Sequence, residues 1–165
     1  MEYQKQVERW GVQEIILQGP ETGNPFTEQW VRGTFSCAAQ KVSVEGFYDG
    51  EGIYKVRFMP SFEMPYHFEI EASFLDGKEE GDFAVTPPLE GNHGPVHVAY
   101  TYHFAYEDGT PYYPVGTTCY VWELQSEELQ EETLRELAKG YFNKIRFCVF
   151  PKHYIYNFHE PISYP

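Results

Sequence analysis

Arg146 is the residue whose position in the sequence has the clearest chemical consequence. It interrupts an otherwise apolar run from Lys144 to Phe150, and alternation places it on the same face as Cys148 and opposite Phe147. A guanidinium stays charged at accessible pH, so a buried one needs a carboxylate partner or water. A buried Arg146 is therefore expected to pair with a carboxylate, and a structural ion pair is one interpretation of it.

The other residue types that perform chemistry show no diagnostic spacing. The sequence contains three cysteines that are widely separated, and this number and spacing predict neither a disulfide framework nor a zinc site. No phosphate-binding glycine loop, nucleophile elbow or dinucleotide fingerprint is present, so no cofactor is expected. The sequence also predicts no metal site, because five histidines are interpreted as structural or exposed: His67, His93, His97, His103 and His159.

Two strands and one helix are expected to position Arg146. The strands span Tyr112–Tyr120 and Lys144–Phe150, and the helix spans Glu127–Lys139 with Ser126 as its N-cap. Strand, helix and strand in this order form a βαβ unit, which requires parallel strands. Acidic residues follow the first strand, and we interpret them as a solvated loop and helix start: Glu123, Glu127 and Glu128.

The first half of the chain is expected to be a β-sandwich. Apolar residues alternate with polar ones in Tyr66–Phe74, and turn signals recur every ~8–12 residues. A Pro/Gly-rich break covers Thr86–Pro95. These patterns predict a mainly β fold with an immunoglobulin-like β-sandwich at residues 1–90, a linker at 91–98, and a hairpin with one βαβ unit at 99–165.

Composition and charge exclude several classes of partner. The 165 residues carry a net charge of -13, which disfavours nucleic acid and anionic membrane surfaces. No apolar run reaches the ~20 residues that span a bilayer, and the N-terminus lacks a signal-peptide pattern. The sequence therefore favours a cytoplasmic location, although a chain whose leader had been removed would show the same pattern.

Several motifs of the first half carry a resemblance to a known domain. This half resembles the β-sandwich of unknown function that precedes the catalytic barrel in bacterial glycoside hydrolases. The resemblance rests on residues 7–11, on Gly19-Pro20 through Phe26, on residues 46–50 and on residues 54–60.

The second half resembles the opening of the apiosidase-like (β/α)8 catalytic domain. The matching residues run from Tyr102 through Gly116-Thr117-Thr118 to Trp122, and resume at residues 142–146 and 150–153. A complete barrel needs ~250 residues. The resemblance therefore implies an incomplete (β/α)8 barrel, with the carboxyl pair used in glycoside hydrolysis lying beyond Pro165. The 165-residue chain alone is expected to be inactive.

The resemblance also implies roles for individual residues. Arg146 would point into the barrel and support a catalytic carboxylate of the complete enzyme. Residues after the two barrel strands would contact sugar, since aromatic faces stack on sugar rings, with ordinary packing as the alternative. These candidates are Tyr120, Trp122, Phe150, Lys152 and His153.

The function expected on this basis is that of the N-terminal part of a glycoside hydrolase acting on plant or microbial polysaccharide. The alternative is a non-catalytic β-sandwich module that binds carbohydrate or supports the barrel. Expected partners are carbohydrate and the remainder of the barrel. Because the last strand would be an open edge, self-association through it is also expected.

Overall fold

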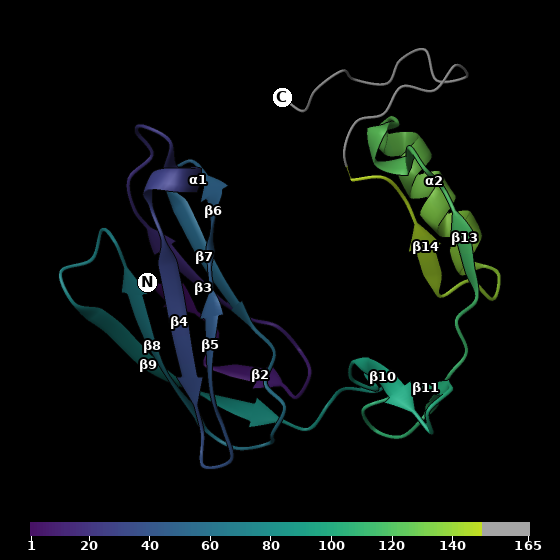
Figure 1. The fold of residues 1–165 in the computed structure, drawn as a ribbon, viewed down its shortest axis with the longest axis horizontal. Helices are drawn as coiled ribbons and strands as arrows, with labels where there is room; N and C mark the ends of the chain where they lie inside the picture. Colours follow the sequence, from purple (N-terminus) through teal and green to yellow (C-terminus); the bar gives the residue numbers. More distant parts are fainter. Residues whose placement is uncertain (150–165) are drawn as a thin grey trace. The chain divides into compact units, whose positions relative to one another are not determined.

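The computed structural model of the protein describes residues 1–149 and contains two compact units (Figure 1). The first unit comprises Met1–Val98 and Tyr106–Thr110, and the second comprises Ala99–Ala105 and, within the described residues, 111–149. None of the helices within the described residues is long and apolar enough to cross a membrane.

Two β-sheets form the first unit (Figure 1). The four-stranded sheet has the order β1-β3-β7-β6, with β1 at Glu2–Tyr3, β3 at Gln13–Gln18, β7 at Ile53–Phe58 and β6 at Phe47–Gly50. The five-stranded sheet has the order β2-β9-β8-β4-β5, with β2 at Gln6–Glu8, β9 at Lys78–Thr86, β8 at Tyr66–Ala72, β4 at Val31–Ser36 and β5 at Lys41–Glu45. Neighbouring strands are antiparallel except β2 and β9, which are parallel.

The two sheets share one hydrophobic core. Phe35 of β4 stacks on Phe58 of β7 with ring centroids 4.2 Å apart, and Tyr66 of β8 stacks on Phe83 of β9 at 5.4 Å. The alternation predicted from the sequence is confirmed, because one face of β7 and one face of β8 are buried: Tyr54, Val56 and Phe58, and Tyr66, Phe68, Ile70 and Ala72. The mainly β fold is thus confirmed, whereas its immunoglobulin-like type stays a prediction.

The chain crosses from the five-stranded to the four-stranded sheet at Trp10, between β2 and β3. Trp10 has a φ of 64° and donates its backbone N–H to the Pro60 carbonyl at 2.9 Å. The Arg9 guanidinium lies 3.8 Å from the centroid of the Trp10 ring. Gly94 approaches this ring so closely that a Cβ there would lie 2.6 Å from it, so only glycine fits.

Short elements depart from the sequence predictions. The one-turn helix α1 (Pro25–Glu28) was not expected. The residues from Val96 to Tyr106 do not form a single strand, because Tyr100 and Thr101 have positive φ and separate two strands. These are β10 (Val96–Ala99) and β11 (His103–Tyr106), which form a three-stranded sheet in the order β10-β11-β12 with β12 (Pro111–Tyr112).

The second unit contains a parallel β-α-β arrangement. It consists of β13 (Gly116–Thr118), the short 3-10 helix η1 (Trp122–Leu124), α2 (Glu127–Ala138) and β14 (Lys144–Arg146). β13 and β14 pair in parallel, with Thr118 opposite Arg146, as predicted for a βαβ unit. The predicted helix and its cap are confirmed, because the Ser126 hydroxyl accepts the Leu129 N–H. A partial barrel stays a prediction.

Both predicted strands of this unit are shorter than expected. The run Tyr112–Tyr120 contains only the end of β12 and β13, and Tyr113 and Val115 between them hydrogen-bond to Asn143, which precedes β14. β14 ends at Arg146, although Cys148 still donates its backbone N–H to the Tyr120 carbonyl at 2.9 Å. Phe150, the expected end of the strand, lies outside the described residues.

Candidate functional site

A pocket of about 310 Å³ lies between the segment after β13 and the start of α2. Two of the predicted sugar-contact residues, Tyr120 and Trp122, line it together. Its other lining residues are mainly small or apolar: Thr118, Cys119, Val121, Gln125, Leu129 and Thr133. The structure therefore brings the aromatic candidates of the first strand into one concave surface.

Gln130 of α2 fixes the pocket wall that carries Trp122. The indole N–H donates to the Gln130 carbonyl at 3.1 Å, and the Gln130 amide donates to the carbonyls of Glu123 and Gln125 at 3.2 and 2.8 Å. Phe147 packs edge-on against the same indole at 5.4 Å. Sequence analysis missed Gln130, because a glutamine on a charged helix shows no local signal of a tertiary contact.

Arg146 is the last residue of β14, and Phe147 follows the strand, so the opposite faces expected for these two side chains stay a prediction. Its guanidinium carbon is 5.7 Å from the centroid of the Tyr120 ring, a cation–π distance. Arg146 is exposed, and within residues 1–149 no carboxylate forms an ion pair with it. The lining of the pocket does not include Arg146, but Tyr120, whose ring the guanidinium approaches, is a lining residue.

Glu123 differs from the expectation of a solvated loop residue. Both of its carboxylate oxygens are shielded from solvent, and neither accepts a hydrogen bond within the part of the chain that the structure describes. Glu127 and Glu128, in contrast, are exposed in the first turn of α2 as expected. A carboxylate that is shielded from solvent and accepts no hydrogen bond lowers the stability of the fold. Among the described residues of this unit, Glu123 is the acidic residue in this state.

Asn143 positions the start of β13. Its side-chain oxygen accepts the Val115 N–H at 2.9 Å, and its amide donates to the Tyr113 carbonyl at 2.9 Å. The Asn143 backbone N–H also donates to the Val115 carbonyl at 2.9 Å, so the backbone and side chain of Asn143 together hold the segment just before the parallel ladder begins. The remaining predicted contact residues, Phe150, Lys152 and His153, lie outside the described residues.

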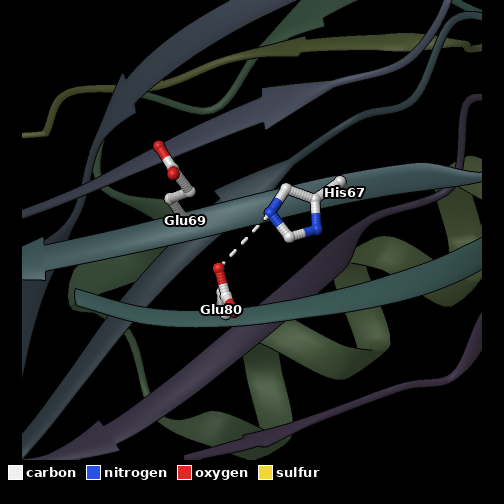
Figure 2. Close-up of side chains that lie close together, drawn as sticks. All are labelled: His67, Glu69 and Glu80. Atoms are coloured by element: carbon white, nitrogen blue, oxygen red, sulfur yellow. Dashed lines mark ion pairs between the residues drawn. The ribbon is translucent and has the colours of Figure 1, made fainter.

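One group of side chains in the described residues has a spacing that suits a metal ion. His67, Glu69 and Glu80 of the first unit offer ligand atoms that all lie within 4.8 Å of one another (Figure 2). The sequence assigned no metal ligand, because these residues meet only through the register of β8 and β9.

Comparison with known proteins finds a matching family model and a similar solved structure. Residues 6–73 match the model of a domain of unknown function, DUF5060. A crystal structure of a protein from Bacteroides vulgatus ATCC 8482, described as a "putative glycoside hydrolase", matches 98% of this chain with 42% identity and a TM-score of 0.90. The chain covers 32% of that protein's length. No curated protein matches.

Proposed function

We propose that these residues form the N-terminal part of a glycoside hydrolase that acts on plant or microbial polysaccharide. The first unit serves as an immunoglobulin-like β-sandwich that supports the enzyme. The second unit begins a (β/α)8 barrel, and the catalytic acid pair is supplied by later strands. The observation that carries this proposal is the match of nearly the whole chain, at 42% identity, to one third of the Bacteroides structure.

The geometry of the second unit supports the same function. In (β/α)8 enzymes the active site lies at the carboxyl ends of the strands. Tyr120 and Trp122 follow the carboxyl end of β13, and Arg146 ends β14 directly beside Tyr120. Aromatic rings with a polar edge suit sugar binding, and a fixed cation can orient an acid. We therefore assign sugar contact to Tyr120 and Trp122, and support of a catalytic carboxylate to Arg146.

The test uses the complete product of the gene that encodes these residues. Sugar release from a panel of plant and microbial polysaccharides is measured for this product and for the 165-residue chain. We expect hydrolysis only by the complete product. Binding of a glycan without hydrolysis by either protein would instead favour the non-catalytic module.

Variants of the complete product then test the assigned roles. Arg146→Met is expected to lower kcat by roughly 10²-fold or more, because an acid that loses its orienting cation is misplaced. Arg32→Met is the matched control, since Arg32 is an exposed arginine that pairs with Glu45 on the first unit. Trp122→Ala is expected to raise KM, with Trp30→Ala as its control. Activity of Arg146→Met within about threefold of wild type would refute the supporting role.

A further inference from the structure

We propose that His67, Glu69 and Glu80 bind one divalent transition-metal ion, with Zn²⁺ as the ion that suits this donor set best. The site lies on the first unit, where β8 and β9 pair (Figure 2). It is independent of the sugar pocket, whose residues all belong to the second unit.

Strand register brings the three ligands together. In the β8–β9 ladder His67 is opposite Asp82, and Glu69 is opposite Glu80. His67 and Glu69 are two residues apart on β8, so they share the face that points away from the core, whereas Phe68 between them is fully buried. The backbone positions of His67 and Glu69 are therefore fixed by β8, whose other face is buried in the core.

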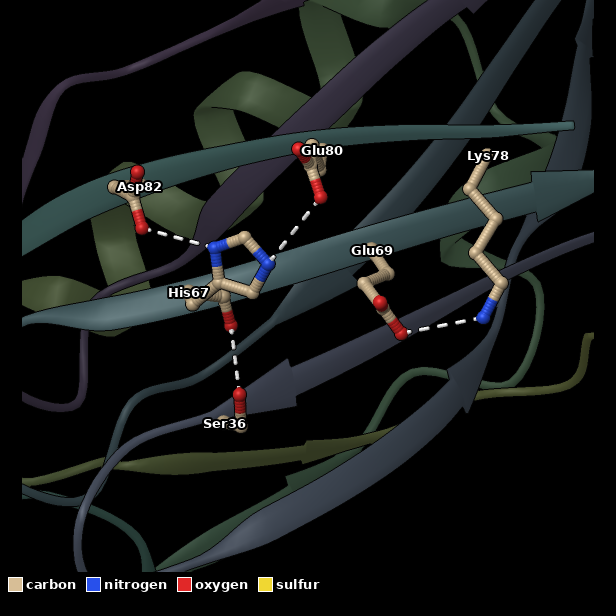
Figure 3. A network of polar contacts seen from close by, with 6 residues as sticks. All are labelled: Ser36, His67, Glu69, Lys78, Glu80 and Asp82. Carbon is tan, nitrogen blue, oxygen red and sulfur yellow. Dashed lines mark hydrogen bonds and ion pairs between the residues drawn. The ribbon is translucent and has the colours of Figure 1, made fainter.

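The His67 ring is already oriented as a metal ligand. Its Nδ1 lies 2.9 Å from Asp82 Oδ1 (Figure 3). A carboxylate accepts, so Nδ1 is the nitrogen that donates, and the neutral ring carries its lone pair on Nε2. Nε2 faces Glu80, with Oε2 3.8 Å away. A carboxylate that holds the second nitrogen of a ligating histidine is the usual outer contact of protein metal sites.

Charge at this place also favours a cation. Glu69 and Glu80 are directly opposite across the ladder, and like charges in that position are destabilising. Lys78 lies beside Glu69, with its Nζ 3.3 Å away (Figure 3), but it offsets this charge only in part, because the same Nζ is 3.1 Å from Glu71. Within residues 1–149 no lysine or arginine pairs with Glu80. A divalent ion between the two carboxylates would remove this repulsion.

The spacing fits a small tetrahedral ion after minor adjustment. Zinc bonds of ~2.0–2.2 Å place two tetrahedral ligand atoms about 3.4 Å apart. The separation of His67 Nε2 from Glu80 Oε2 is 3.8 Å, and rotation of the exposed Glu80 side chain and of the half-buried Glu69 side chain can bring the ligand atoms closer. An imidazole with two carboxylates disfavours Ca²⁺ and Mg²⁺, which prefer all-oxygen sets. Water would complete the coordination.

The experiment is calorimetric titration of the 165-residue chain with ZnCl₂, with CaCl₂ as the comparison ion. We expect a zinc site that His67→Asn and Glu80→Gln each weaken at least tenfold. Asp82→Asn should weaken it by about 10–100-fold, because Asp82 orients the ring without binding the ion. Lys78→Gln should tighten it, since the competing ammonium is removed from Glu69. His97→Asn is the matched control, because His97 is an exposed histidine with one carboxylate, Glu107, at 3.5 Å.

The location of the ion is checked by anomalous scattering at the zinc edge from crystals soaked in ZnCl₂. A peak between His67 and Glu80 is expected, whereas a peak only at a cysteine or at another histidine would refute the proposal. An affinity that changes less than threefold in both His67→Asn and Glu80→Gln would also refute it. Circular dichroism shows whether each variant is folded. If His67→Asn does not fold, the zinc affinity of Glu80→Gln alone tests the proposal.

Discussion

Glu123→Met is expected to stabilise the second unit. Both carboxylate oxygens of Glu123 are shielded from solvent and accept no hydrogen bond from the described residues. A buried polar group without a partner costs about 1–3 kcal/mol, and more when it is charged. Methionine has a similar length and no such cost, so the free energy of unfolding should rise by about 1–2 kcal/mol.

Native-state hydrogen exchange of the α2 amides measures this change, because Glu123 lies in the turn that precedes α2. A gain of 1–2 kcal/mol corresponds to roughly 5- to 30-fold greater protection. Glu123→Gln removes the charge but keeps an unpartnered polar group, so a smaller gain is expected.

Glu128→Met is the matched control and should act in the opposite direction. Glu128 is exposed in the first turn of α2, where a negative charge interacts favourably with the helix dipole by ~0.3–1 kcal/mol. Its replacement should therefore reduce protection slightly. If Glu123→Met reduces α2 protection more than Glu128→Met does, then Glu123 has a favourable partner in solution and the reasoning is wrong.

Three further outcomes are expected. A hydrogen bond from His93 lowers the pKa of Asp108 to about 2. This interaction therefore stabilises the fold above pH ~4, and the stabilisation is lost as the pH falls toward 2. His93→Asn should raise the pKa of Asp108, which a carboxyl NMR titration measures. Phe35→Ala should cost the first unit about 3–5 kcal/mol in urea unfolding, because Phe35 is fully buried against Phe58, and a loss below 1 kcal/mol would contradict this. Asn143→Ala should cost about 1–2 kcal/mol and reduce exchange protection in β13, with unchanged protection as the contrary result.

Sequence reasoning succeeded where a pattern is local. The alternation in β8 is a property of consecutive residues, and it predicted which side chains are buried. The cap of α2 is equally local, because Ser126 and Leu129 are three residues apart. The parallel pairing of β13 and β14 followed from the helical crossover that connects them.

Sequence reasoning failed where distant residues decide the structure. The positive φ of Trp10 depends on the Pro60 carbonyl, which lies fifty residues further along the chain. Asn143 bonds to Tyr113 and Val115 through its side chain as well as its backbone, and nothing in the local sequence indicates that role. Glutamate is a residue type typical of exposed loops, and the carboxylate of Glu123 is shielded only by the packing of the folded chain around it.

The two candidate sites arise from the two kinds of strand pairing in this chain. Parallel strands bring their carboxyl ends to the same edge, so the residues that follow β13 and end β14 meet there, as Tyr120 and Arg146 do. Antiparallel strands place side chains opposite one another along their whole length, so His67 and Glu80 meet in the middle of a sheet. A one-residue shift in the β8–β9 register would turn His67 and Glu69 toward the core and abolish the proposed metal site. The same shift would leave the pocket around Trp122 unchanged, because no residue of β8 or β9 lines it.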